Sequence, residues 1–144
     1  MAVTAYAYGK AQAAIMNKEV DWTSDTIKVA LTTAAHIPDP TDDYFNDITN
    51  EITGTGYVAG GATLATCTAT YTAATKTLAL DAADTAWTGA TFTAHYAHIY
   101  DAQSGAAATS PLLAYIDFGS NVSVAAGTFT LAWNAAGIIT LTAS

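Results

Sequence analysis

The stretch from Thr91 to Tyr100 constrains the fold more than any other part of the chain. It reads Thr-Phe-Thr-Ala-His-Tyr-Ala-His-Ile-Tyr and contains no Asp, Glu, Lys, Arg, proline or glycine. Read with a period of two residues, neither face is plainly polar, which is typical of a β-strand covered on both sides. Such a strand needs neighbours along its edges and layers on its faces. The run therefore predicts the centre of a β fold, not the wall of an active site.

Other short runs alternate apolar and polar residues or are bounded by turn residues: Thr26–Thr32, Ala62–Thr72, Lys76–Leu80, Leu112–Phe118, Thr128–Trp133 and Ile138–Thr142. We expect the second and third runs to pair as one hairpin and the last two as another. Turn signals recur about every ten residues. The pattern predicts a mainly β, single-domain β-sandwich or flattened barrel of about seven to nine short antiparallel strands.

The N-terminal segment, residues 1–20, is expected to form a short helix or a docking arm in front of a β-sandwich domain over residues 21–144. Apolar residues fall at helical spacing from Tyr8 to Ile15, so a helix over Ala5–Lys18 could cover one end of the sheet. Tyrosines in this segment could equally mark an arm that docks on a neighbour.

The charge balance excludes several classes of partner. The chain has 12 acidic residues, four lysines and no arginine, with a formal net charge of −8. Nucleic-acid binding depends on Lys and Arg neutralising phosphates, so we expect no DNA or RNA partner. The same argument disfavours an anionic membrane surface, and no apolar run approaches the ~20 residues of a membrane helix.

The composition favours a protein that hides surface in an assembly. Hydrophobic residues make up 51% of the chain and charged residues only 11%. A soluble chain with so few charges is expected to cover part of its surface with copies of itself or with another protein. The N-terminus has no basic region followed by an apolar core, which predicts no signal peptide and a cytosolic site of synthesis and assembly.

Candidate catalytic and metal-binding residues are weak. His95 and His98 lie three residues apart on the predicted central strand and should point to opposite faces, so we expect structural histidines and no shared metal. His36 is expected to be exposed beside the acidic loop Asp39–Asp47. This loop could hold calcium, but it lacks the spacing of an EF-hand and is better explained as a solvated turn.

The remaining chemistry is also sparse. Gly54–Gly61 predicts bends with positive φ but matches neither phosphate-binding template. The single Cys67 excludes an internal disulfide, and no base or cation adjoins it in the sequence, so a small buried side chain is expected. No pattern resembles a paired acid and base. We therefore expect no catalytic residues and no cofactor.

Four stretches resemble small Ala/Thr-rich virion structural proteins of tailed bacteriophages. They are Trp22–Leu31, Asn50–Leu64, Thr93–Asp101 and Asp117–Gly119, and the likeness covers most of the chain from Trp22 onward. The Asn-Glu-Ile-Thr-Gly-x-Gly-Tyr block that opens the second stretch is its most specific part. In that family the position of His95 is often arginine and the position of His98 is often aliphatic, so any contact that needs a basic side chain there is altered in this chain.

The resemblance implies a non-enzymatic head decoration, or cement, protein bound to the capsid exterior of the virion and assembled in the host cytoplasm. Its partners would be the major capsid protein and copies of itself, as a dimer or trimer. Candidate interface residues are Tyr6, Tyr8, Tyr44 and Phe45. The alternatives are a tail component, either tube or receptor-binding, and a carbohydrate-binding β-sandwich module suggested by the three tryptophans.

Overall fold

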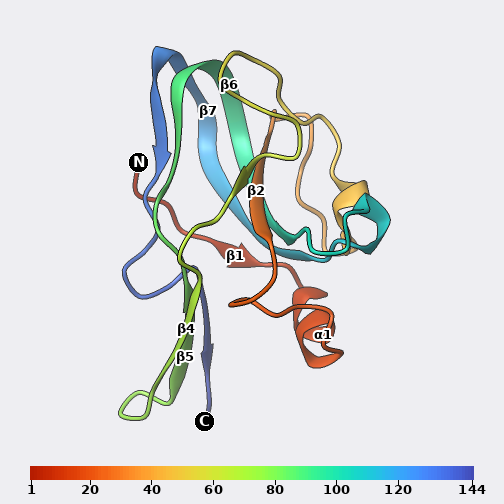
Figure 1. Cartoon of the computed structure of the whole chain (residues 1–144), viewed down its shortest axis with the longest axis vertical. Helices are drawn as coiled ribbons and strands as arrows, with labels where there is room; N and C mark the ends of the chain where they lie inside the picture. Colours follow the sequence, from red (N-terminus) through yellow and green to blue (C-terminus); the bar gives the residue numbers. More distant parts are fainter.

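The computed structural model describes all of residues 1–144 and contains two antiparallel sheets and one short α-helix (Figure 1). The larger sheet has the strand order β1-β7-β6-β2-β3, and the smaller one has the order β4-β5-β8. The bounds are β1 Tyr6–Ala7, α1 Ala11–Met16, β2 Ile27–Thr32, β3 Ala62–Thr63, β4 Thr68–Thr72, β5 Thr77–Asp81, β6 Thr85–Asp101, β7 Leu112–Leu131 and β8 Ile139–Thr142. Single turns of 3-10 helix, η1 and η2, span Phe45–Asp47 and Ala107–Thr109. The predicted mainly β class is confirmed, and the sheets do not close into a barrel.

Two long strands dominate the larger sheet. β6 has 17 residues and β7 has 20, and the two pair along nearly their whole length and arch together through the molecule (Figure 1). We expected short strands and a break after Phe118. No break occurs, because the exposed segment after Phe118 still pairs with β6. Val124, for example, lies opposite Phe92. Irregular pairing at four places along β6 allows these strands to curve.

The central run is covered on both faces only in its second half. Ala97–Asp101 is buried at every residue, whereas Thr91 and Thr93 are exposed. The reason is the length of the neighbouring strand, because β2 pairs with β6 only from Tyr96 to Asp101. The first half of the run therefore has one side facing solvent.

The N-terminal prediction needs a correction. Residues Tyr6 and Ala7 form an edge strand on β7, opposite Tyr115 and Ala114, and the helix starts only at Ala11. The backbone is extended here because the free edge of β7 offers hydrogen-bonding groups, including the Leu113 carbonyl that accepts from the Tyr8 N–H at 3.0 Å. The segment thus docks as a strand, but on its own chain.

Of the two predicted hairpins, only the first is confirmed. β4 pairs with β5, with Thr72 opposite Thr77, although β3 at the start of the predicted first strand belongs to the other sheet. The prediction of the second hairpin is wrong, because β8 pairs with β5 and not with β7. The turn before β8 redirects the chain, and the Ile138 N–H donates to the Leu80 carbonyl at 2.8 Å.

One continuous core of 27 buried residues lies mainly against the larger sheet and includes Leu80 and Ile139 from the smaller one. Gly61 shows how closely the backbone is packed there: its φ is +78°, and any Cβ would collide with the Val29 carbonyl. The glycine-rich run therefore bends with positive φ as expected. No helix has the length and apolar character required to cross a membrane.

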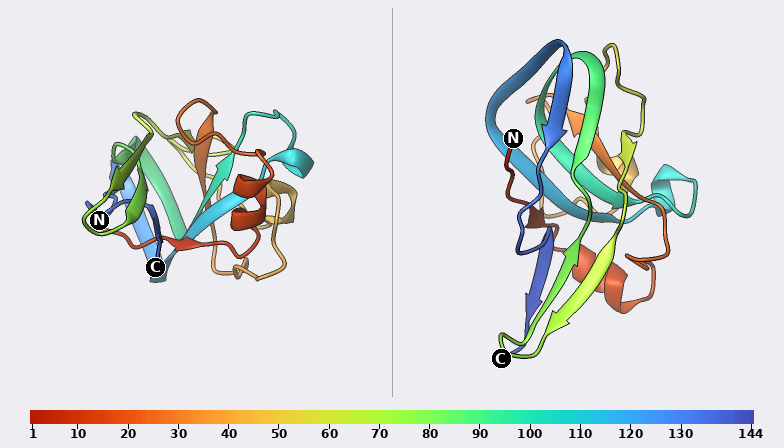
Figure 2. Two further views of the ribbon diagram at one scale, coloured as in Figure 1. Left: turned by 90° about the horizontal axis from the view of Figure 1, so that it is seen from below. Right: turned by 60° about the vertical axis from the view of Figure 1, so that its left-hand side comes forward.

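The smaller sheet projects from the body. Figure 2 shows β4, β5 and β8 extending away from the larger sheet as a narrow layer, with the C-terminus near its outer end. Every residue of β4 is exposed, while Leu80 and Ile139 at the base of the layer are buried in the core. The molecule thus combines a closed body with an open, three-stranded extension.

Candidate interaction surfaces

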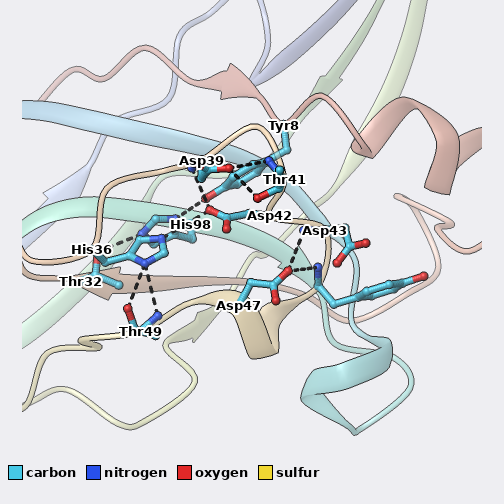
Figure 3. Close-up of polar contacts among 11 residues, drawn as sticks. Tyr8, Thr32, His36, Asp39, Thr41, Asp42, Asp43, Asp47, Thr49 and His98 are labelled. Carbon is cyan, nitrogen blue, oxygen red and sulfur yellow. Dashed lines mark hydrogen bonds and ion pairs between the residues drawn. The ribbon is translucent and has the colours of Figure 1, made fainter.

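A buried polar cluster lies at the centre of the larger sheet. Nδ1 of His98 is hydrogen bonded to the Tyr8 hydroxyl at 2.7 Å, and its Nε2 is hydrogen bonded to the Thr32 hydroxyl at 2.9 Å (Figure 3). Burial, helped by neighbouring His36, lowers the pKa of His98 to about 3. His98 is therefore neutral at physiological pH and joins β2, β6 and the N-terminal segment.

His36 was expected at the surface, but it is buried. Its ring packs edge-on against that of His98 with centroids 4.9 Å apart, and its Nδ1 accepts from the Thr49 N–H at 3.3 Å. Its Nε2 has no hydrogen-bond partner and lies 3.7 Å from Oδ2 of Asp42. Burial lowers the pKa of His36, and the Asp42 carboxylate partly offsets this change. The acidic loop is thus held to the core by a histidine, which sequence reasoning missed.

His95 and His98 point to different surroundings, as strand geometry predicts. His95 is half-buried, and its Nδ1 is hydrogen bonded to Oδ1 of Asn121 at 2.9 Å. Its Nε2 lies 3.7 Å from Oδ1 of Asp117.

The carboxylates of the acidic loop are used to shape its turns. Asp39 accepts from the N–H and the hydroxyl of Thr41, and Asp42 accepts from the Asp39 N–H at 2.9 Å (Figure 3). Asp47 accepts from the N–H groups of Asp43 and Tyr44. These donors lower the pKa values of Asp39 and Asp47. Nowhere in the chain do three or more possible metal ligands come together.

The four candidate interface residues lie in different settings. Tyr6 is exposed at 53% on the edge strand β1, whereas Tyr8 is only 2% exposed and offers a partner almost no surface. Tyr44 and Phe45 are half-buried. The ring of Phe45 stacks on that of Tyr100 with centroids 3.9 Å apart, so one face of Phe45 is used within the chain and is closed to a partner.

The hydroxyl of Tyr44 donates to the Glu19 carboxylate at 3.0 Å. The Asp47 carboxylate caps the 3-10 turn η1 by accepting from the Tyr44 N–H at 3.4 Å. Among the four candidates, Tyr6 is therefore the one best placed to contact a partner.

The Asn50–Leu64 block binds to the neighbouring strands through two tyrosine hydroxyls. The Tyr57 hydroxyl accepts from the Leu31 N–H at 3.0 Å and donates to the Glu51 carboxylate at 2.6 Å. The Tyr100 hydroxyl donates to the Gly60 carbonyl at 2.7 Å. The segments Trp22–Leu31, Asn50–Leu64 and Thr93–Asp101 thus form one packed unit around β2 and β6.

Asp101, the last residue of β6, is a buried acid. It is 1% exposed, and one of its oxygens, Oδ2, has no hydrogen-bond donor. Burial raises its pKa to about 7, and the nearby Asp25 and Asp21 carboxylates add to this increase. The hydrogen bond that Asp101 accepts from the Gln103 N–H lowers the pKa and offsets part of it. No local signal distinguishes it from a solvated turn residue.

The three tryptophans are core residues. All three are buried, and the indole N–H groups of Trp22 and Trp133 donate to the backbone carbonyls of Asp81 and Ala83. Their burial removes the feature that suggested a carbohydrate-binding module. Cys67 is half-buried, not fully buried as expected, and burial raises the pKa of its thiol.

The projecting sheet has two chemically distinct faces because successive residues of a strand point to opposite sides. One face is a hollow of about 650 Å³ lined mainly by threonine and alanine. Cross-strand neighbours on it include Thr72, Thr77 and Thr142, and the last two are hydrogen bonded through their hydroxyls at 3.0 Å. The opposite face carries apolar residues, among them Tyr71, Leu78 and Leu141.

Comparisons with family models, with curated proteins and with solved structures found no match to this chain.

Proposed function

We propose that this chain is a non-enzymatic structural protein of a tailed-phage virion, a decoration protein that binds the outer surface of the capsid. The observation that carries the proposal is the amount of large apolar surface left in contact with water. Seven large apolar side chains are exposed: Met1, Tyr6, Met16, Ile37, Val58, Tyr71 and Leu141. Scattered apolar residues are ordinary at a protein surface, but here they accompany an unusually small number of charges.

Charge supports the same proposal. A chain with a net charge of −8 is repelled by packaged DNA, so a position on the outside of a shell is favoured over one inside. A decoration protein stabilises a shell by burying area at the joints between capsid subunits, which requires a rigid surface. The closed core and the long β6–β7 pair provide such a body.

The exposed edge strand β1 is the surface that we assign to capsid binding. Tyr6 projects from it, and its ring lies 5.7 Å from that of Tyr115 on β7. β1 has only two paired residues and one free edge, so a capsid strand or loop can be added beside it.

The test is to incubate purified protein with capsids that lack it and to image them by cryo-electron microscopy. Regular density on the capsid surface is expected, and Tyr6→Ser should weaken it. Density at the tail alone would favour the tail-component alternative. No labelling of any virion part, together with measurable binding to a glycan array, would favour the carbohydrate-binding alternative.

A further inference from the structure

The apolar face of the projecting sheet carries a row of three large side chains that runs across all three strands. Tyr71 lies opposite Leu78, and Leu78 lies opposite Leu141. Tyr71 is 60% exposed and Leu141 is 42% exposed, while Leu78 between them is half-buried. This outer row is therefore a cross-strand cluster that nothing in the same chain covers.

The outer row lies next to a row of the same face that packs into the core. The next row toward the body consists of Ala69, Leu80 and Ile139, of which the last two are buried. A hollow beside this inner row is lined by Ile15 and Trp22 as well as Ala69. The body thus covers the base of the apolar face and leaves its outer end open.

Charge is sparse on the projecting sheet, and Lys76 lies in the turn between β4 and β5. Asp81, at its base, is the single charged residue in β4, β5 and β8, although the chain carries 12 acids in total. The apolar row of the sheet itself carries no charge, so copies that meet through it bring no like charges of the row together. Its outer edges also lack the charges, prolines and bulges that normally protect edge strands from pairing.

We propose that the occupant of this face is the same face of another copy, with the Tyr71–Leu78–Leu141 rows packed together around a rotational symmetry axis. A symmetric contact suits a patch that is apolar and uncharged, because each row is complementary to itself. The inference deepens the proposed function and rests on it for its biological setting, but the self-association itself can be measured without capsids.

The available area limits the strength of this contact. A sheet three strands wide and five residues long covers roughly 240 Å². A standard interface buries about 800 Å² on each partner, so association through this face should be weak and dependent on concentration. Attachment of copies to neighbouring sites on one shell would raise their effective concentration and complete the contact. We therefore expect a monomer at about 5 µM and clear oligomers at about 500 µM.

The experiment is sedimentation velocity of the full chain over this concentration range, with two lysine variants on adjacent positions of β8. Leu141→Lys places a charge on the apolar row, and Thr142→Lys places the same charge on the threonine face. Both variants reduce the net negative charge equally, so a change in overall repulsion cannot distinguish them. We expect Leu141→Lys to remain monomeric at every concentration and Thr142→Lys to associate like the unmodified chain.

Three results would overturn the proposal: an unmodified chain that stays monomeric at the highest concentration, a Leu141→Lys variant that associates normally, or a Thr142→Lys variant that loses association to the same extent. Circular dichroism of each variant checks the fold, and Tyr71→Ser provides a second substitution on the same row. Capsid labelling without self-association would overturn this inference alone. Self-association without capsid labelling would overturn only the proposed function.

Discussion

Asp101 should make the stability of this protein fall as the pH rises toward neutrality. The carboxyl group has a pKa of about 7 in the folded chain, raised from 3.8 mainly by burial and by neighbouring Asp25 and Asp21. Between these two values the folded chain holds a proton that the unfolded chain has released. The free energy of unfolding is therefore highest near pH 4 with respect to this group and declines up to about pH 7.

The size of the effect follows from the shift. Each pKa unit corresponds to about 1.4 kcal/mol, so a shift of this size corresponds to about 4 kcal/mol. If water reaches the ionised Asp101 carboxylate through small local movements, the effect is smaller. We therefore expect ionisation of Asp101 to lower the free energy of unfolding by about 2–4 kcal/mol above pH 7.

Asp101→Asn tests the argument because it removes the charge and keeps the geometry. The amide oxygen can still accept from the Gln103 N–H, which lies 2.8 Å from the Asp101 carboxylate. Its NH₂ group can donate to the neighbouring Asp25 carboxylate. We expect the variant to exceed the unmodified chain in stability by about 2–4 kcal/mol at pH 8 and to match it near pH 4.

Urea denaturation followed by the fluorescence of the three buried tryptophans measures this difference at pH 4, 6 and 8. Asp117→Asn is the matched control, because Asp117 is exposed but likewise accepts from an N–H two residues ahead, that of Gly119 at 2.7 Å. A variant that is less stable at pH 8, or a difference that does not change with pH, would show that Asp101 is not a strained buried carboxyl.

Three further predictions concern the core. Gly61→Ala should lower the free energy of unfolding by at least about 3 kcal/mol because the methyl group meets backbone, whereas Gly105→Ala, with similar positive φ and open space, should lower it by about 1 kcal/mol in the same urea assay. Tyr8→Phe should lower the thermal midpoint by an amount equivalent to about 1–2 kcal/mol, since Nδ1 of His98 loses its partner. NMR should show the His98 ring neutral down to about pH 4, so stability from its burial is present above pH 6.5 and is lost as the pH falls toward 3.

Elements with local causes were predictable from the sequence. β2 alternates Ile27, Val29 and Leu31 toward one side, and the β4–β5 hairpin has a short turn between two alternating runs. Both follow from a period of two residues and from nearby turn residues. The separation of His95 from His98 followed from the same geometry.

Elements with distant causes were not predictable. β8 pairs with a strand about 60 residues away, and neither its composition nor its spacing favours β5 over the nearer end of β7. Tyr6 and Ala7 become a strand only because β7 has a free edge. His36 is buried because it meets the ring of His98, which lies far along the chain. Each is a tertiary contact that overrides a local preference.

The two faces of the projecting sheet differ in whether their side chains can form hydrogen bonds with water. This difference makes the apolar face the one that should drive association. The threonine hydroxyls can hydrogen bond to water or to one another, as Thr77 and Thr142 do, so covering that face gains little. The opposite row has no polar side-chain atom except the Tyr71 hydroxyl. Burying a large apolar side chain fully contributes about 1.5–3 kcal/mol, and part of that remains to be gained at Tyr71 and Leu141. A second copy on the apolar row, as proposed above, would therefore gain free energy that contact with the threonine face would not.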